Sequence, residues 1–392
     1  MIVGCMIGSF FAGPIAKRLG PKLSFFVIGC VGVVSSVLYH IATAADQFWV
    51  LCIGRLLIGL VLGLVCVACP MYVSERACPK YSKMLGVLFQ FFTTFGIFLA
   101  ALVGMAVGQS IGFESGNNQH LAGRMQCICA FSTLLSLFMV LLGLFLGGYG
   151  LHESDEDVYH SDGGQQQEDN EKTGGKQYTI YQMSFRIFMG VMVAGTLQLT
   201  GINAVMNYAP TIMSSFSLAA LVGNFIVMLW NFVTTIISIP LASVLTMRQL
   251  FLACSFLTSV CCLLLCGIPV YPGVASTNVK NGVAITGILL FIAFFEFGVG
   301  PCFYVLSQDM FPPSFRPKGA SFTMVAQFIF NIIINLCYPI LTEKISGGPS
   351  GDQDKGQAVA FIFFGCIGIV CFVVEFFFLH PWDDSVDEIG DY

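Results

Sequence analysis

The stretch FRIFMGVMVAGTLQLTGINAVMNYAPTIM, residues 185–213, joins the apolar length of a membrane span to three carboxamide side chains. A transmembrane helix needs roughly 20 mostly apolar residues, and the stretch supplies them. Gln198, Asn203 and Asn207 nevertheless stand where hydrocarbon is expected. An unpaired amide removed from water costs on the order of 2–7 kcal/mol, so such groups persist at membrane depth only where helices, water or a ligand satisfy them. The stretch therefore predicts a membrane protein and indicates where its ligand binds.

The rest of the chain is similarly apolar. Hydrophobic residues make up 56% of the 392 residues, charged residues make up 10%, and the mean hydropathy is +0.83. A soluble domain of this size would not carry 38 Phe on its surface. We predict an all-α polytopic membrane protein with eleven spans, in the windows 1–16, 23–44, 48–69, 84–107, 121–150, 185–213, 217–245, 249–271, 282–308, 319–343 and 357–379.

Positively charged residues fall mainly in alternate loops, and this pattern predicts the orientation, because Lys and Arg in short loops stay on the cytoplasmic side. The cytoplasmic set comprises Lys17, Arg18, Lys22, Arg76, Lys80, Lys83, Lys172, Lys176, Arg186, Arg248, Arg316 and Lys318. The acidic tail 382–392 is then cytoplasmic and Met1 is outside. Because an outside start that opens directly on a helix is unusual, we expect one further span before Met1.

The polar segment from His152 to Gln177 divides the chain into two halves. It is rich in Asp, Glu, Gln, Gly and Ser and has almost no residues able to bury surface, which is typical of a solvated linker. Five windows precede it and six follow, which becomes six and six with a span before Met1. The predicted organisation is an N-terminal helical bundle, a cytoplasmic linker, a C-terminal helical bundle and a cytoplasmic tail, at 1–150, 151–184, 185–380 and 381–392.

Cysteine and histidine do not form a recognisable metal or cofactor site in the sequence. The 16 Cys lie mostly in apolar windows, where packing is their default role, and the five His include no pair at i, i+4. The sequence contains no HExxH motif, no GxSxG motif and no paired intramembrane acids. We therefore predict no metal, no cofactor and no enzymatic activity.

Carboxamide side chains recur through the predicted spans. Gln and Asn both donate and accept hydrogen bonds without a charge, which suits the hydroxyls of a neutral polyol. Gln198 and Asn203 are about 140° apart on an ideal helix, so both face one cavity only if the backbone loosens at Thr200-Gly201. Alternatively, carboxamides join helices to one another, with each contact worth roughly 0.6–2 kcal/mol. Further carboxamides, several at helical spacing, are Gln90, Asn224, Asn231, Gln327, Asn331 and Asn335.

An acid, a proline and a base recur after the third and the ninth windows, which is weak internal symmetry of the kind that transporters carry. The two sets are Glu75, Pro79 and Lys83, and Asp309, Pro313 and Arg316. Around them stand further motifs in order: GPIAKRLGPK at 13–22, Gly54-Arg55, PMYVSE at 70–75, QLTGIN at 198–203, Phe295-Glu296, Gly300-Pro301 and DMFP at 309–312.

In these motifs the chain resembles the sugar porter branch of the major facilitator superfamily, the glucose-transporter-like proteins. FPPSFRPKGASF at 311–322 and ISGGPSG at 345–351 are most similar to hexose transporters of kinetoplastid protozoa. The resemblance covers nearly the whole chain and implies a major facilitator fold of two six-helix bundles. The chain departs from the family pattern at Leu197, where a second Gln is usual, and at Tyr304, where Trp is usual.

The resemblance also implies a sugar site at mid-membrane. The substrate-binding residues we expect are Gln90, Gln198, Asn203, Asn231, Glu296 and Gln327. Glu296 is the only acid that this interpretation places well inside a window, where it accepts a sugar hydroxyl or belongs to an inner gate; alternatively it bonds to cytoplasmic Arg residues. We interpret Asn224, Asn331 and Asn335 as packing or gate residues.

Charged residues at helix ends indicate a gate. Ion pairs between them would hold the cytoplasmic face shut and separate when the halves rock, and surface pairs of about 0–1 kcal/mol each suit a reversible latch. The partner of Arg55 is expected on the span before Met1, because the topology places Arg55 nearer the outer side. The gate residues we expect are Arg18, Arg55, Glu75, Lys83, Tyr208, Asp309 and Arg316.

We predict a facilitative hexose carrier, for glucose and also fructose, that binds sugar between its halves and alternates access. The alternative is a proton-coupled sugar or polyol symporter, and a non-transporting sugar sensor is a third hypothesis. The expected partners are a monosaccharide and the lipid bilayer, without nucleic acid. We expect a monomer or weak oligomer, spanning the plasma membrane many times.

Overall fold

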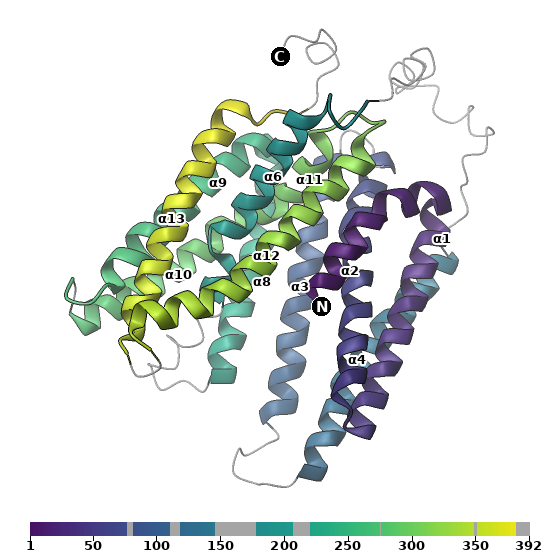
Figure 1. Cartoon of the computed structure of the whole chain (residues 1–392), viewed down its shortest axis with the longest axis horizontal. Helices are drawn as coiled ribbons and strands as arrows, with labels where there is room; N and C mark the ends of the chain where they lie inside the picture. The colour runs from purple at the N-terminus through teal and green to yellow at the C-terminus, as the bar shows by residue number, and fades with distance from the viewer. Residues whose placement is uncertain are drawn as a thin grey trace.

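The chain folds into helices that run roughly alongside one another, as the computed structural model shows (Figure 1). It describes residues 1–76, 81–109, 118–145, 178–206, 220–274, 276–348 and 351–381. The first half contains α1 (Ile2–Ala45), α2 (Phe48–Arg76), α3 (Ser82–Gln109) and α4 (Asn118–Phe145). The second half contains α6 (Ser184–Leu199), α8 (Ala220–Val244), α9 (Met247–Cys261), η1 (Cys262–Gly267), η2 (Ile268–Val270), α10 (Thr277–Phe294), η3 (Phe295–Val299), α11 (Gly300–Asp309), α12 (Arg316–Ser346) and α13 (Gln353–Phe378).

Ten of the eleven predicted spans are confirmed, in the predicted order, and the first window forms a shorter helix. In the described ranges, ten helical segments are long and apolar enough to cross a membrane, and Ile2–Ala16 is a shorter apolar helix. Together they correspond to the eleven predicted windows. One detail differs: the loop predicted at 17–22 is a bend within α1, where only Gly20 leaves the helical conformation (φ 71°, ψ 170°). Glycine adopts this positive φ without the steric cost that a side chain would bring.

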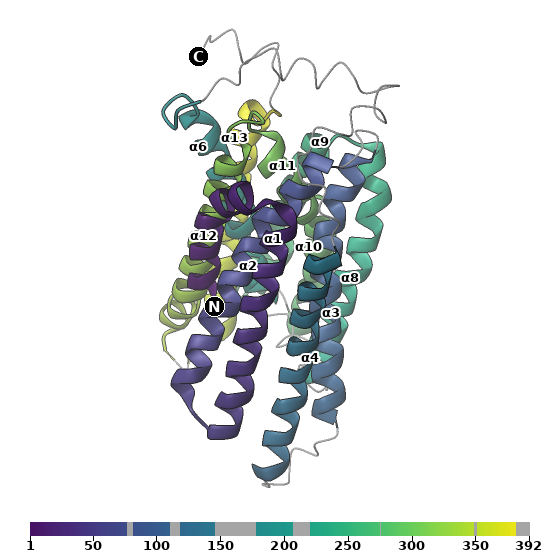
Figure 2. The same cartoon turned by 90° about the vertical axis from the view of Figure 1, so that its right-hand side faces the viewer.

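The helices form two groups, with α1 to α4 on one side and α6 to α13 on the other (Figure 1). The groups meet along two seams, α3 against α8 and α1 against α12 (Figure 2). On the first seam, the rings of Phe95 and Phe98 of α3 lie 5.4 and 5.2 Å from that of Phe232 of α8, and the ring of Phe98 lies 5.7 Å from that of Phe225. Aromatic rings from both halves therefore take part in this contact.

Within the first group, α1 and α2 approach so closely that only glycine fits at the contact. A Cβ added at Gly4 would lie 2.2 Å from the carbonyl oxygen of Leu56, and one added at Gly63 would lie 2.0 Å from that of Cys5. Small residues allow backbones in a membrane to pack at this range, where dispersion contacts drive helix association. The two helices therefore pack as one unit.

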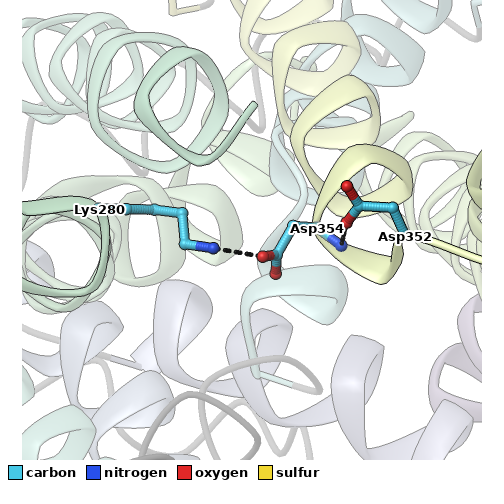
Figure 3. A network of polar contacts seen from close by, with 3 residues as sticks. All are labelled: Lys280, Asp352 and Asp354. Carbon is cyan, nitrogen blue, oxygen red and sulfur yellow. Dashed lines mark hydrogen bonds and ion pairs between the residues drawn. The ribbon is translucent and has the colours of Figure 1, made fainter. Parts of the chain in front are cut away.

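Polar contacts join the N-terminal ends of α10 and α13, which lie opposite the end of the bundle that carries Arg186, Arg248 and Arg316. Lys280 forms an ion pair with Asp354, and the carboxylate of Asp352 caps α13 by accepting a 3.1 Å hydrogen bond from the backbone N–H of Asp354 (Figure 3). Such partly exposed ion pairs contribute about 0–1 kcal/mol. The contact therefore orients the two helix ends more than it stabilises the fold.

Candidate functional site

Glu296 is at the centre of a buried hydrogen-bond network. It lies in η3, a π-helical turn between α10 and α11, and only 2% of its surface is exposed. Its Oε1 accepts a hydrogen bond from Nδ2 of Asn231 (2.9 Å), while its Oε2 accepts from Nε2 of Gln90 (3.0 Å) and Oγ1 of Thr235 (3.1 Å). A carboxyl group buried in a membrane helix needs such partners. π-helical turns such as η3 are also frequent at functional sites.

The network connects the two halves of the molecule. Gln90 comes from α3, whereas Asn231 and Thr235 come from α8 and Glu296 from the second half as well. A Cβ added at Gly300 would lie 3.0 Å from Nε2 of Gln90 and 3.4 Å from Oε2 of Glu296. Gly300 thus leaves room for this contact. Three of the six predicted binding residues are therefore joined directly.

Gln198 forms a second polar cluster. It is 5% exposed on α6, and its Oε1 accepts hydrogen bonds from Nδ2 of Asn203 (2.8 Å) and Nδ2 of Asn331 on α12 (3.1 Å). Asn335 extends the cluster by donating to Oδ1 of Asn331 (3.0 Å). Asn331, interpreted from the sequence as a packing or gate residue, is therefore a direct partner of the central glutamine.

The backbone of this span breaks just after Gln198, as the sequence predicts. α6 ends at Leu199, and Gly201 adopts a positive φ of 94°. A Cβ at Gly201 would also lie 2.9 Å from the ring of Phe364 on α13, so both the conformation and the space favour glycine. The break brings Asn203 within hydrogen-bond distance of Gln198, which about 140° of separation on a straight helix would prevent.

Gln327 and Tyr304 lie beside these clusters without a side-chain hydrogen bond in the described part of the chain. Gln327 is buried one turn before Asn331 on α12. Tyr304 is also buried, and its ring centroid lies 4.4 Å from that of Phe89. Within the described ranges, no hydrogen bond joins the Glu296 network to the Gln198 cluster, so the six predicted binding residues form two groups and one separate residue.

The predicted gate residues are placed only in part. Arg316 donates from Nε to the carbonyl oxygen of Gln308 (3.1 Å), Asp309 is half-buried at the end of α11, and Arg18 is exposed. Arg55 is exposed and lies over the ring of Tyr39, 5.9 Å from its centroid. The side chains of Glu75 and Lys83 and the whole of Tyr208 lie outside the described residues. The ion-pair latch therefore stays a prediction.

Two further arginines organise the Arg-rich end of the second half. Arg186 is 7% exposed; its Nη1 donates to the carbonyl oxygens of His380 (2.9 Å) and Met310 (3.3 Å), and its Nη2 donates to Nε2 of His380 (2.9 Å). Arg248 donates to the carbonyl oxygens of Phe376 (2.7 Å) and Leu379. Both arginines donate to backbone carbonyl oxygens at or just after a helix C-terminus, which have no partner within the helix. The sequence indicated them only as topological charges.

A second buried acid was missed by the sequence interpretation. Glu375 lies near the C-terminal end of the apolar run of α13 and is fully buried, so Glu296 is not the only acid buried within a predicted span. Its Oε1 accepts a 2.6 Å hydrogen bond from Oγ1 of Thr196, while its Oε2 has no hydrogen-bond partner among the described residues. Its position among Val373, Val374 and Phe376 was the signal available in the sequence.

Both clusters offer mostly uncharged donors and acceptors inside a bundle of membrane helices. Carboxamides and hydroxyls match ligand groups that themselves both donate and accept.

In the sequence comparisons, residues 1–383 match the family model described as sugar (and other) transporter. The chain is 56% identical over 392 residues to glucose transporter 2A of Trypanosoma brucei brucei, covering all of this chain and 72% of that protein. It is 48% identical over 392 residues to membrane transporter D2 of Leishmania donovani, covering all of this chain and 70% of that protein.

Solved structures give the same fold. The proton:xylose symporter XylE bound to 6-bromo-6-deoxy-D-glucose, a major facilitator superfamily protein, superposes with a TM-score of 0.79 at 20% identity, covering 97% of this chain and 84% of that one. The inward-open form of XylE superposes with a TM-score of 0.71 at 19% identity, covering 99% and 86%. The helices described above are therefore arranged as in the major facilitator fold.

Proposed function

Because the chain belongs to the sugar transporter family of the major facilitator fold, we propose that it carries hexoses, glucose foremost, across the plasma membrane by facilitated diffusion. The observation that carries the proposal is the buried Gln90–Glu296–Asn231 network, which joins the two halves through uncharged donors around one acid. Glucose transporters of Trypanosoma among its relatives support glucose as the substrate. The sugar crosses unchanged, so the site needs to bind and release rather than to catalyse.

In this proposal the sugar replaces partners within the two clusters. Its hydroxyls donate to Oε1 of Gln198 and to Glu296, and accept from the amides of Gln90, Asn203 and Asn231. Gln327 is buried without a side-chain hydrogen bond in the described structure, so its amide is available to the ligand. Except for Gln327, each of these groups is already directed by a hydrogen bond to a neighbour, which lowers the cost of ordering it on binding.

Alternating access follows if the bundles 1–150 and 185–380 rock about this site. The seam between α1 and α12 supports a closed inner face: the backbone N–H of Gly13 donates to Oγ of Ser321 (3.2 Å) across 308 positions of sequence. A Cβ at Gly13 would lie 2.5 Å from the carbonyl oxygen of Pro317. Closure at this end therefore depends on the absence of a side chain at residue 13.

Gly13→Val is accordingly expected to lower glucose uptake by about tenfold, because overpacking costs about 1–3 kcal/mol and here acts only on the closed inner face. Initial uptake rates of labelled glucose into vesicles containing the purified protein measure the effect. The matched control is Gly104→Val on α3, since in the described structure no other atom lies within 4 Å of a Cβ built there. Equal rates for both variants would contradict the role of the α1–α12 seam.

A facilitator moves sugar without protons, so glucose uptake is expected to leave the pH inside the vesicles unchanged. A pH-sensitive dye trapped in the vesicles measures this, and an added proton ionophore confirms that the dye responds. Acidification that follows glucose addition and requires the protein would instead identify a proton-coupled symporter. Competition of labelled glucose by fructose, galactose and inositol in the same vesicles defines the substrate range.

A further inference from the structure

Glu375 has no part in the sugar site proposed above, yet it is fully buried in a membrane helix. An apolar residue at that position would avoid the cost of removing a carboxyl group from water. The one hydrogen bond that the carboxyl group makes in the described structure comes from Thr196, a residue of α6 that is 179 positions away. Thr196 itself is fully buried. The contact is therefore a specific connection between α13 and α6.

Thr196 lies two residues before Gln198, at the end of the regular part of this span. The hydroxyl group of Thr200 donates to the carbonyl oxygen of Thr196 (2.9 Å), and Gly201 then adopts its positive φ. The hydrogen bond to Glu375 thus holds the last regular turn before the break. Gln198 belongs to that turn.

Three residues of α13 contact the span on which Gln198 lies, at and just before its backbone break. Phe364 packs against Gly201, and a Cβ at Gly368 would lie 3.3 Å from Cγ2 of Thr200. Residues 364, 368 and 375 lie within about 40° of one another on an ideal helix. One face of α13 therefore supports the broken segment of α6, and Glu375 accepts the hydrogen bond that Thr196 donates to this face.

We propose that Glu375 is a positioning residue for the sugar site: through Thr196 it fixes the turn of α6 that presents Gln198 to the ligand. The inference rests on the proposed function, since it assigns a role in binding hexose. Without the hydrogen bond, the turn loses its anchor next to a backbone break that has no regular helix to restrain it. Gln198 then meets Asn203 and Asn331 in more than one orientation, and the sugar binds less tightly.

The test uses the full chain in vesicles and compares Thr196→Val with Thr196→Ser. Valine keeps the shape of threonine and removes the donor, whereas serine keeps the donor. We expect Thr196→Val to raise the KM for glucose about five- to tenfold with a maximal rate per folded protein within about twofold of wild type, a change of the size that loss of one buried hydrogen bond produces. Thr196→Ser is expected to keep the wild-type KM.

A second pair of variants addresses the acid itself. Glu375→Gln retains an oxygen that accepts from Thr196 and is expected to keep the KM within about twofold, whereas Glu375→Leu is expected to raise it as Thr196→Val does. If Thr196→Val does not fold, this pair decides. A merely structural role would lower thermal stability or maximal rate and leave the KM unchanged, and that result overturns the proposal.

Glucose uptake by the wild-type protein distinguishes a failure of the proposed function from a failure of the positioning role alone. If it takes up no labelled glucose, the proposed function fails, whatever the variants do. If wild type transports glucose and both Thr196→Val and Glu375→Leu keep its KM, the positioning role of Glu375 alone is overturned.

Discussion

Glu296→Ala is expected to lower glucose uptake by about 100-fold or more. The substitution removes the acceptor of three buried donors, on Gln90, Asn231 and Thr235. A buried polar group left without its partner costs about 1–3 kcal/mol, and each 1.4 kcal/mol corresponds to a factor of about ten in rate. It also removes the contact that joins the two halves at the proposed site. Initial rates of labelled glucose uptake into vesicles measure the effect.

Two companion variants show whether the loss is specific. Glu296→Gln keeps one acceptor oxygen but directs an NH2 group at a donor, so uptake is expected to fall about tenfold. Glu343→Ala removes an acid that is exposed near the end of α12, and uptake is expected to stay at the wild-type rate. Uptake by Glu296→Ala within threefold of wild type would rule out the network as the centre of the site.

Gln198→Ala is expected to abolish most glucose uptake, by about 10- to 100-fold, while the protein still folds. The substitution removes Oε1, which accepts from Asn203 and Asn331, and leaves those two amides without this partner. It also removes a sugar ligand of the proposed site. Uptake rates measure the loss, and thermal unfolding with gel filtration in detergent measures folding.

The control for this variant is Gln353→Ala, because Gln353 is an exposed carboxamide at the start of α13. It is expected to transport glucose at the wild-type rate. If Gln198→Ala folds and also transports at that rate, Gln198 is excluded from the sugar site and its cluster with Asn331 only joins α6 to α12.

The sequence was sufficient for the spans because every apolar window except 1–16 is as long as a bilayer requires. It also predicted the break at Thr200-Gly201, since two polar groups about 140° apart needed a common side. It did not predict that α1 continues through residues 17–22, because positive charges are as compatible with a bent helix as with a loop.

Contacts between residues far apart in the chain could not be predicted from the sequence. The bond from Thr196 to Glu375 spans 179 positions and that from Gly13 to Ser321 spans 308, and neither is encoded in a local spacing. Asn331 illustrates the same limit: its helical spacing with Gln327 and Asn335 was visible, but which neighbour it faces depends on how α12 is rotated against α6. Glu375 lies only four residues before the C-cap of its helix, where an acid often reaches water.

The aromatic seam between α3 and α8 is one of the contacts that the two halves must rearrange in the proposed transport cycle. The rings of Phe98 and Phe232 are almost parallel, at 8°, and attraction between aromatic faces tolerates offset and tilt. Tilting one bundle by a few degrees therefore exchanges one set of ring contacts for another of similar strength. In the transport cycle proposed above, we expect the hydrogen bond from Gln90 to Glu296, rather than the aromatic seam, to resist the rocking of the two halves.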